Sequence, residues 1–173
     1  MFFQYIAVEG VIGVGKSVVV EKLAERLDAA TVQEEWATNP FLKPFYDGAP
    51  GAAFQTELFF LLSRYRQQQE LQQRSLFKHV TLSDYVFDKS KLFAYLNLDD
   101  SELLIYEKLY SLLAEGIPRP DLVVYLQAPT EVLMKRIRSR GRPEEASMSP
   151  EYLGEVNRAY NHYFFHYTQT PLL

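Results

Sequence analysis

The chain has 173 residues, a formal net charge of −4 and no cysteine, and 47% of its residues are hydrophobic. This length suits a single domain over residues 1–173 with a sizeable core, whereas the negative charge argues against a nucleic-acid polymer as a partner. The lack of cysteine excludes disulfides and thiolate chemistry and agrees with a cytoplasmic location. We expect no signal peptide, since the first residues carry no cationic region, and no membrane span.

Residues 10–17 read Gly-Val-Ile-Gly-Val-Gly-Lys-Ser, which matches the phosphate-binding P-loop. A β-branched and aromatic run at 2–8 precedes the loop, and apolar residues at helical spacing follow it at 18–27. In such loops backbone N–H groups surround phosphates, the lysine reaches the β- and γ-phosphates, and the serine hydroxyl lies on Mg²⁺. We therefore predict ATP and Mg²⁺ as cofactors, bound by Gly10, Gly13, Val14, Gly15, Lys16 and Ser17.

Strands and helices alternate along the rest of the chain, which predicts an α/β fold with a parallel sheet. Further strands are expected at 30–33, 80–83 and 122–126, and a fifth where the sequence stops, which leaves room for the natural protein to continue past Leu173. Helices are expected at 41–46, 52–75, 100–115, from an N-cap at Thr130 to the basic segment at 136–142, and from Ser149-Pro150 onwards.

The long helix at 52–75 is expected to expose its glutamine-rich stretch 67–73 and to bury its apolar face, namely Phe54, Leu58, Leu61, Leu62, Tyr65 and Leu71. The aromatic residues of the last helix are assigned to the core: Tyr160, Tyr163, Phe164 and Tyr167. His162 and His166 have metal-ligand spacing but no third ligand nearby, so a surface or core pair is favoured. Trp36 fits either a pocket for a base or plain packing.

Acidic residues follow two of the expected strands. Ligands of open α/β sheets bind at the carboxyl ends of the strands, so Asp84 is the best candidate to hold Mg²⁺, with a turn cap as the alternative. Asp121 precedes its strand and is expected at the opposite edge of the sheet. Glu34 and Glu35 end the second strand, where one carboxylate could accept the proton of an attacking hydroxyl; two solvated side chains are the alternative.

The basic segment carries four arginines within seven residues. Arginines on a mobile segment over a triphosphate stabilise charge on the transferring group, although a basic helix end also complements the helix dipole. The sequence contains no Asn-Lys-x-Asp motif of GTPases and is too short for the paired domains of helicases, which leaves a kinase of a small molecule. The arginines concerned are Arg136, Arg138, Arg140 and Arg142.

Several spaced motifs resemble those of the bacterial deoxyribonucleoside kinases, the family that includes deoxycytidine, deoxyadenosine and deoxyguanosine kinases. Glu34 stands five residues before Asn39, like the glutamate of the family's Glu-Pro-Val before Asn-Pro, with Glu35 in place of the proline. Glu57 and Arg64 match a family glutamine and an arginine seven residues later. The family's lid motif is complete, with Arg136, Arg140, Gly141, Arg142, Glu144 and Glu145.

The resemblance covers essentially the whole chain and implies a five-stranded parallel sheet flanked by helices, a lid at about 136–148 and a homodimer formed by helix packing. It implies phosphorylation of a deoxyribonucleoside 5′-hydroxyl by ATP in nucleotide salvage. The implied catalytic residues are Glu34 as general base, Lys16, Arg140 and Arg142, with Arg136 also on ATP. The acceptor would contact Glu34, Trp36, Tyr46, Glu57, Arg64, Asp84 and Glu145, with Tyr46 and Glu145 on its 3′-hydroxyl.

The chain departs from the family pattern after the third strand. The acidic-Arg-Ser motif reads Asp84-Tyr85-Val86, so an arginine that helps to hold the 5′-hydroxyl and phosphates is replaced, and Lys89 is the candidate substitute. Two rivals stay open: a nucleoside monophosphate kinase of the thymidylate type, which needs additional cations near Glu34 and Tyr46, and a nucleotide-binding protein without catalysis.

Glu57 is the second departure, because the family has glutamine there. An ionised carboxylate only accepts hydrogen bonds, which suits the N1–H and N2–H₂ donors of guanine, whereas a protonated one imitates glutamine. Burial raises the pKa of a carboxyl group, and Arg64 would oppose that rise. We expect an ionised Glu57 and a preference for deoxyguanosine.

Overall fold

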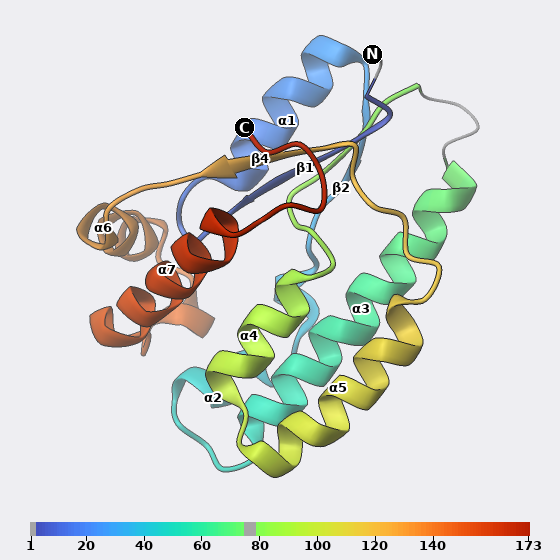
Figure 1. The fold of residues 1–173 in the computed structure, drawn as a ribbon. Helices are drawn as coiled ribbons and strands as arrows, with labels where there is room; N and C mark the ends of the chain where they lie inside the picture. The colour runs from blue at the N-terminus through green and yellow to red at the C-terminus, as the bar shows by residue number, and fades with distance from the viewer. Residues whose placement is uncertain (1–2, 75–78) are drawn as a thin grey trace.

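The computed structural model describes residues 3–74 and 79–173. Within this part of the chain, four parallel strands form one sheet in the order β2-β3-β1-β4, and helices flank it (Figure 1). The strands are β1 (Tyr5–Gly10), β2 (Ala30–Val32), β3 (Thr81–Ser83) and β4 (Leu122–Leu126). The helices are α1 (Lys16–Leu27), α2 (Leu42–Tyr46), α3 (Ala52–Arg74), α4 (Lys89–Asn97), α5 (Asp100–Ala114), α6 (Thr130–Arg140) and α7 (Pro150–Phe165), with 3₁₀ turns at Trp36–Thr38 and Pro143–Glu145.

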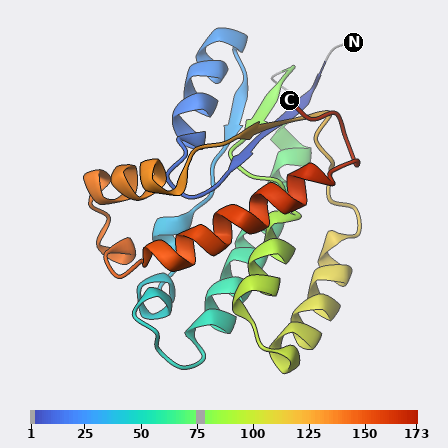
Figure 2. The same cartoon turned by 60° about the vertical axis from the view of Figure 1, so that its left-hand side comes forward.

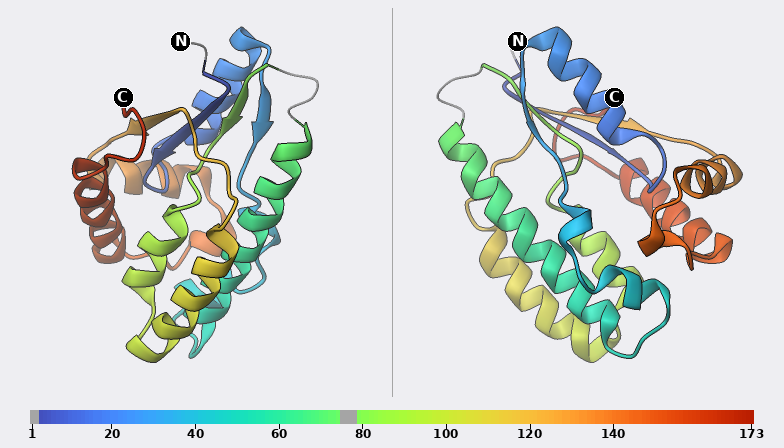
Figure 3. Two further views of the ribbon diagram at one scale, coloured as in Figure 1. Left: turned by 45° about the vertical axis from the view of Figure 1, so that its right-hand side comes forward. Right: turned by 180° about the vertical axis from the view of Figure 1, so that it is seen from behind.

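The sheet is covered on both faces, because successive side chains of a strand point to opposite sides. Val8 of β1 packs with Val20 of α1 on one face. Its neighbour Ala7 belongs to the cluster on the other face, with Leu153 and Tyr160 of α7. Figure 2 shows α7 running across the sheet on the side away from α1, and the right-hand view of Figure 3 shows α1 on the near side.

A second core joins the helices that extend beyond the sheet. Leu61 of α3, Ala94 of α4 and Tyr106 of α5 pack together and are fully buried. Figure 1 shows these three helices side by side beyond the carboxyl ends of the strands. Of the three, α3 and α4 line the space beyond the ends of the strands, and α5 packs against both of them.

The strand register brings the predicted acidic residues to one edge of the sheet. Ala7 of β1 pairs with both Ser83 of β3 and Val123 of β4, so the P-loop and Asp84 leave the sheet at the same edge. Asp121 lies at the opposite edge, where its Oδ2 accepts hydrogen bonds from the N–H groups of residues 4 and 5 at 2.8 and 2.9 Å. Both predicted placements are confirmed.

The last residues lie beside β4, where the fifth strand was expected. Leu172 forms an isolated parallel bridge with Val123, and the N–H of Tyr125 donates to the carbonyl oxygen of Leu173 at 2.8 Å. The described sheet therefore has four strands and a single further bridge, and the α/β fold with a parallel sheet is confirmed.

The structure corrects the expectations for α3. Leu62 is 56% exposed and does not join the core, because α3 turns it away from α4 and α5. Gln67 and Gln68, expected in solvent, are buried. Gln67 donates to the carbonyl oxygen of Gln33 at 2.8 Å and accepts from Tyr85, so this polar stretch pairs with polar groups of the sheet edge. The expected helix end at residue 75 lies outside the described residues.

Other boundaries differ by small, explicable amounts. The first strand runs to Gly10 instead of ending at Val8. The N-cap of α6 is Pro129, and the Thr130 hydroxyl accepts a hydrogen bond from Asn157 instead of capping the helix. Helix α4 was not expected at all. Ser149 caps α7 as predicted, accepting from the N–H of Tyr152.

In the part of the chain that the structure describes, none of the helices combines the length and the apolar character that crossing a bilayer requires.

Candidate active site

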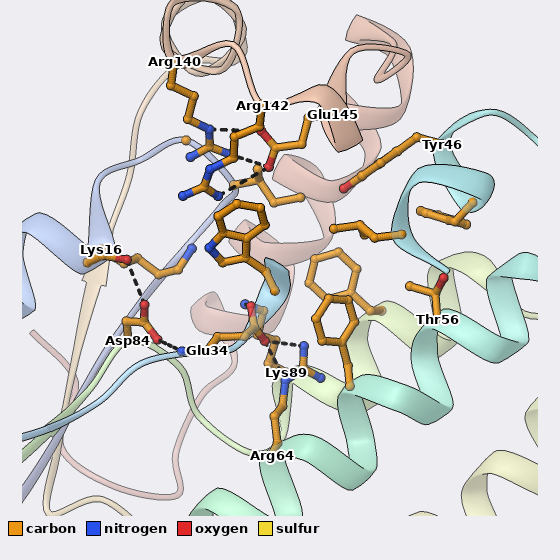
Figure 4. A pocket seen from close by; sticks show the side chains of 18 of the residues that line it. Lys16, Glu34, Tyr46, Thr56, Arg64, Asp84, Lys89, Arg140, Arg142 and Glu145 are labelled. Carbon is orange, nitrogen blue, oxygen red and sulfur yellow. Dashed lines mark hydrogen bonds and ion pairs between the residues drawn. The ribbon is translucent and has the colours of Figure 1, made fainter. Parts of the chain in front are cut away.

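A cavity of about 300 Å³ opens at the carboxyl edge of the sheet, between the P-loop, α3, α4 and the segment that joins α6 to α7 (Figure 4). It brings together most of the residues singled out in the sequence: Gly13, Gly15, Lys16, Ser17, Glu34, Trp36, Tyr46, Glu57, Arg64, Asp84, Arg140, Arg142 and Glu145. Lys89 lines it as well, together with apolar and aromatic residues that the sequence did not single out, among them Leu42, Phe45, Phe60, Phe93 and Tyr152.

The P-loop turns directly from β1 into α1. Gly15 has a left-handed backbone (φ 106°) and precedes the first helical residue, Lys16. The first N–H groups of a helix have no partner inside the helix, so they are available to an anion at this end of the cavity. Gly13, also left-handed (φ 86°), lies against α6, where a Cβ atom would come within 2.9 Å of the Ile137 side chain. The loop therefore needs glycine both for its turn and for its packing.

Lys16 extends along the loop, and its Nζ donates to the carbonyl oxygen of Gly10 at 2.7 Å. Burial and the charge of Lys89 lower the pKa of Lys16 to about 8, against the opposing effect of Glu9, Glu34 and Asp84. At neutral pH the ammonium form still dominates. A positive charge is thus held at the place where the motif puts the β- and γ-phosphates.

Glu9 is a buried carboxylate that the sequence reasoning missed. Its Oε2 accepts from the N–H of Gly10 at 2.9 Å and its Oε1 from the N–H of Val86 at 3.0 Å. It therefore ties the start of the P-loop to the segment that follows β3. The signal was present as an acidic residue directly before the first P-loop glycine, but the strand was expected to end one residue earlier.

Ser17 and Asp84 meet beside Lys16. The Ser17 hydroxyl donates to Asp84 Oδ2 at 2.9 Å, and the other Asp84 oxygen accepts from the N–H of Glu34 at 2.8 Å. A hydroxyl and a carboxylate are hard oxygen ligands, and Mg²⁺ is commonly held by one or two such groups together with substrate phosphates. The pair fits that ion. No cluster of three or more acidic, histidine or cysteine side chains that could hold a metal by itself occurs among the described residues.

Glu34 lies in the middle of the cavity between two cations (Figure 4). Arg64 contacts its Oε1 through Nε at 2.7 Å and Nη2 at 2.6 Å, and Lys89 contacts its Oε2 at 2.9 Å. Burial alone would raise the pKa of Glu34, but the charges of Arg64 and Lys89 outweigh it and hold this pKa far below its usual range. Glu35, in contrast, points outwards to Arg66 at 3.3 Å, with 43% of its side chain exposed.

The arginine segment covers the cavity from the side of α6. Arg140 forms two hydrogen bonds with Glu145, at 3.0 and 2.6 Å. Arg142 lies over the ring of Trp36, with the guanidinium carbon 3.5 Å from the ring centroid. Arg136 holds the P-loop instead, since it donates to the carbonyl oxygen of Val14 at 2.9 Å.

Arg138 faces a different part of the surface, near Arg158. The arginines predicted at the phosphates therefore divide into a pair at the cavity, one on the loop itself and one elsewhere.

Aromatic residues close the end of the cavity away from the P-loop. Tyr46 contacts Phe45 and Tyr152 with ring centroids 5.1 and 6.1 Å apart. Figure 4 shows its hydroxyl directed into the cavity, and burial raises its pKa well above the usual value. Trp36 agrees with both interpretations given for it, a residue of the pocket and a packing residue, because it lines the cavity and packs against Arg142.

The remaining candidates are structural. His162 and His166 are exposed and lie against each other, with ring centroids 4.6 Å apart. Tyr160 and Phe164 are buried in the core of the sheet, with Tyr163 and Tyr167 packed against it. The interpretation of both groups as non-catalytic agrees with these positions.

Comparison with known proteins places this geometry in a family. Residues 6–173 match the family model described as deoxynucleoside kinase. The chain belongs to the deoxynucleoside kinase family. It is 35% identical over 153 residues to a deoxyguanosine kinase of Bacillus subtilis, covering 88% of this chain and 74% of that protein. A deoxyadenosine/deoxycytidine kinase of the same organism is 29% identical over 183 residues, covering 97% of this chain and 80% of that protein.

The fold agrees with solved structures. A deoxyadenosine kinase from M. mycoides with bound dATP superposes with a TM-score of 0.86 at 22% identity, over 98% of this chain and 89% of that one. The prediction that this chain is a kinase of deoxynucleosides is confirmed by its family.

The departure after β3 has a structural explanation in this deoxynucleoside kinase. Tyr85 is buried behind the sheet edge, where its hydroxyl donates to Gln67 at 2.9 Å. Lys89, four residues later on α4, contacts Glu34, and its role as the substitute for the family arginine stays a prediction. Two cations, Arg64 and Lys89, thus lie beside Glu34, as a thymidylate-type kinase would need, but both are paired with Glu34 itself.

Glu57 differs from the expectation. Its Oε1 accepts from Asn97 Nδ2 at 2.8 Å, whereas its Oε2 is buried and has no hydrogen-bond partner among the described residues. Burial raises the pKa of Glu57 to about 7, although the hydrogen bond from Asn97 and the charge of Arg64 act against the rise. The prediction of a carboxylate kept ionised by Arg64 was therefore wrong: near neutral pH both protonation states are populated.

Replacing Glu57 by glutamine should change how stability depends on pH. A raised pKa in the folded state means that the unfolded chain loses its proton first, so the free energy of unfolding of the wild type falls as pH rises from about 4.5 to about 7. Relative to Glu57→Gln, this loss should total about 3 kcal/mol, since each pKa unit is worth about 1.4 kcal/mol. Urea unfolding of both proteins between pH 4 and pH 8 measures it. A difference that stays constant over this range would show that Glu57 titrates normally.

Proposed function

We propose that this chain transfers the γ-phosphoryl group of ATP to the 5′-hydroxyl of a deoxynucleoside. The observation that carries the proposal is the ionised Glu34, held by Arg64 and Lys89 in a cavity that also holds the P-loop lysine. An acceptor hydroxyl beside Glu34 would face the phosphates bound at Lys16. This is the in-line arrangement that phosphoryl transfer requires.

Glu34 acts as the general base in this proposal. A carboxylate that two cations keep ionised is a weak base. Phosphoryl transfer, however, depends mainly on positioning the reactants and on stabilising charge, so the reaction needs little proton affinity from its base until the new bond is well advanced. The 5′-hydroxyl donates to a Glu34 oxygen, and its proton passes to that oxygen as the new bond from the 5′-oxygen to the γ-phosphorus forms. The bond between the γ-phosphorus and the β,γ-bridging oxygen breaks at the same time, and ADP leaves with that oxygen. Arg64 and Lys89 fix the carboxylate in place through this step.

The phosphates are held from two sides. Lys16 and the first turn of α1 bind the phosphates on the side of the P-loop. Arg140 and Arg142 bind them on the opposite side, from the lid (residues 136–148), which closes over the donor. Arg136 supports the loop through the Val14 carbonyl. Ser17 and Asp84 would hold Mg²⁺, which when bound supplies charge neutralisation on the phosphoryl oxygens.

The deoxynucleoside occupies the rest of the cavity. Tyr46 and Glu145 take the 3′-hydroxyl, and Trp36 forms a wall of the pocket. The base lies towards Glu57, whose position seven residues before Arg64 on α3 puts it about 10 Å along the helix from the Glu34 contact. A molecule anchored by its 5′ end at Glu34 thus reaches Glu57 with its base.

A homodimer is part of the proposal. Leu104, Ile105 and Leu112 of α5 are exposed by 58%, 52% and 72%, and exposed apolar faces of this kind mark interaction surfaces. We expect sedimentation equilibrium to give twice the mass of one chain and Leu112→Glu to shift the protein towards monomer. A wild-type monomer at micromolar concentration would contradict the dimer. A cytoplasmic location stays a prediction.

Replacing Glu34 by glutamine tests the catalytic assignment. Glu34→Gln keeps the size and a hydrogen-bond acceptor but removes the proton acceptor, so kcat should fall by about 10²–10⁴-fold. The measurement is steady-state phosphorylation of the four deoxynucleosides by ATP with Mg²⁺, with the four deoxynucleoside monophosphates as alternative acceptors.

Two variants serve as controls for this assay. Glu35→Gln changes an exposed neighbouring carboxylate and should leave kcat nearly unchanged, whereas Lys16→Ala should abolish turnover with the fold intact. Equal losses in Glu34→Gln and Glu35→Gln would refute the role of Glu34. Turnover on monophosphates only, or ATP binding without turnover on any acceptor, would refute the proposed function.

A further inference from the structure

Polar atoms without partners gather at the end of the cavity away from the P-loop. Glu57 Oε2, the Thr56 hydroxyl and the Tyr152 hydroxyl are all buried and have no hydrogen-bond partner among the described residues, and all three side chains line the cavity. Figure 4 shows Thr56 at this end, near Tyr46. Buried polar groups are normally paired, so these atoms indicate contacts that a bound molecule completes.

The hydrogen bond from Asn97 determines which oxygen of Glu57 is left to contact a bound molecule. Its amide Nδ2 donates to Oε1 at 2.8 Å, and an amide nitrogen can only donate. Oε1 is therefore kept as an acceptor in either protonation state, and a proton taken up by the carboxyl group resides on Oε2. Oε2, the oxygen of this cavity-lining residue that Asn97 leaves without a partner, accepts a hydrogen bond when Glu57 is ionised and donates one when it is protonated.

Charged and titratable groups surround Glu57 from every element packed near it. Arg64 on α3 and Lys89 on α4 favour its ionised form, and Glu34 disfavours it. Tyr46 of α2, Tyr106 of α5 and Tyr152 of α7 interact with its charge, and burial raises the pKa of each of these phenols. These phenols are neutral near pH 7, and Arg64 and Glu34 keep their charge, since the pKa of Arg64 is raised and that of Glu34 is lowered. Glu57 therefore changes its charge between pH 6 and pH 8 while these neighbours do not.

The two states of Oε2 suit different bases. The Watson–Crick edge of guanine presents the N1–H donor beside the N2–H₂ donor, which an acceptor oxygen satisfies. Adenine N1 and cytosine N3 are acceptors and need a donor at the same place. When the oxygen meets the wrong edge, two donors or two acceptors face each other in a buried site, and each keeps the desolvation penalty of an unsatisfied polar group.

We propose that Glu57, with Oε1 fixed by Asn97, selects the base through the protonation state of Oε2, so that guanine is accepted by the ionised form and adenine or cytosine by the protonated form. This inference rests on the proposed deoxynucleoside site and adds to it a specificity that depends on pH. Asn97 is a positioning residue, since it acts on the base through Glu57.

The test compares deoxyguanosine with deoxyadenosine and deoxycytidine from pH 6 to pH 8. The ratio of kcat/KM values is used because effects of pH on the transfer step cancel in it, and these bases do not titrate in this range. The ratio should shift towards deoxyguanosine by at least about tenfold as pH rises, since the ionised-to-protonated ratio of one group changes tenfold per pH unit. Quenching of the single tryptophan, Trp36, which lines the cavity, should give the same shift in the ratio of Kd values without catalysis.

Three variants separate this selection from a structural role. Glu57→Gln should make the ratio independent of pH, whereas Glu25→Gln, the same change on the exposed face of α1, should keep the wild-type profile. Asn97→Ala removes a hydrogen bond that favours the ionised form, so the midpoint of the profile should move to higher pH. If Asn97 had a purely structural role, Asn97→Ala would lower kcat/KM for all three deoxynucleosides together. The pH at which the ratio changes would then stay as in the wild type.

A flat wild-type ratio, a Glu57→Gln profile like that of the wild type, or thymidine in place of deoxyguanosine at high pH would overturn the inference. If no deoxynucleoside binds or is phosphorylated at any pH, the proposed function itself fails, which is a different result.

Discussion

The contact of Glu34 with Arg64 and Lys89 is the interaction on which the arrangement of the cavity depends. A largely buried carboxylate is expensive unless it is paired and hydrogen-bonded, and here the partners come from α3 and α4 while Glu34 follows β2. Arg64 is further tied to Ser90 of α4 at 2.8 Å. Removing Arg64 or Lys89 would leave one Glu34 oxygen without its charged partner. The helical wall and the sheet edge are therefore held in one geometry by the same group that faces the acceptor.

The cavity shifts the pKa values of two of its carboxyl groups, Glu34 and Glu57, in opposite directions. Glu34 is ionised because cations outweigh its burial, whereas Glu57, on the same helix as Arg64, is largely governed by burial, and its pKa rises to about 7. Sites that need both a base and a hydrogen-bond selector separate their carboxyl groups in this way. The difference follows from contacts: Glu34 has charged partners on both oxygens, and Glu57 has one neutral amide on Oε1.

The parts of the site that sequence reasoning found are those with local signals. A strand, a glycine loop and a helix in succession predict the phosphate-binding end of the cavity. Acidic residues directly after two strands predict side chains at the carboxyl edge of the sheet, because parallel strands end at the same edge. Helix α4 had no such signal: its residues follow a strand without a clear cap, so Asn97 went unrecognised. Glu9 and the buried glutamines of α3 were also missed, since their burial is set by partners at the sheet that are distant in sequence. The protonation state of Glu57 could likewise not be predicted from the presence of Arg64 alone, because its burial also depends on residues distant in sequence.

The structure of this protein with a deoxynucleoside, Mg²⁺ and a non-hydrolysable ATP analogue tests the central claim most directly. If Glu34 and its two cations organise the reaction, the 5′-oxygen will lie about 2.6–3.2 Å from a Glu34 carboxylate oxygen, with the γ-phosphate at Lys16 and both ion pairs of Glu34 intact. A 5′-oxygen bound away from Glu34, or an acceptor that displaces Arg64 and Lys89 from it, would contradict the account.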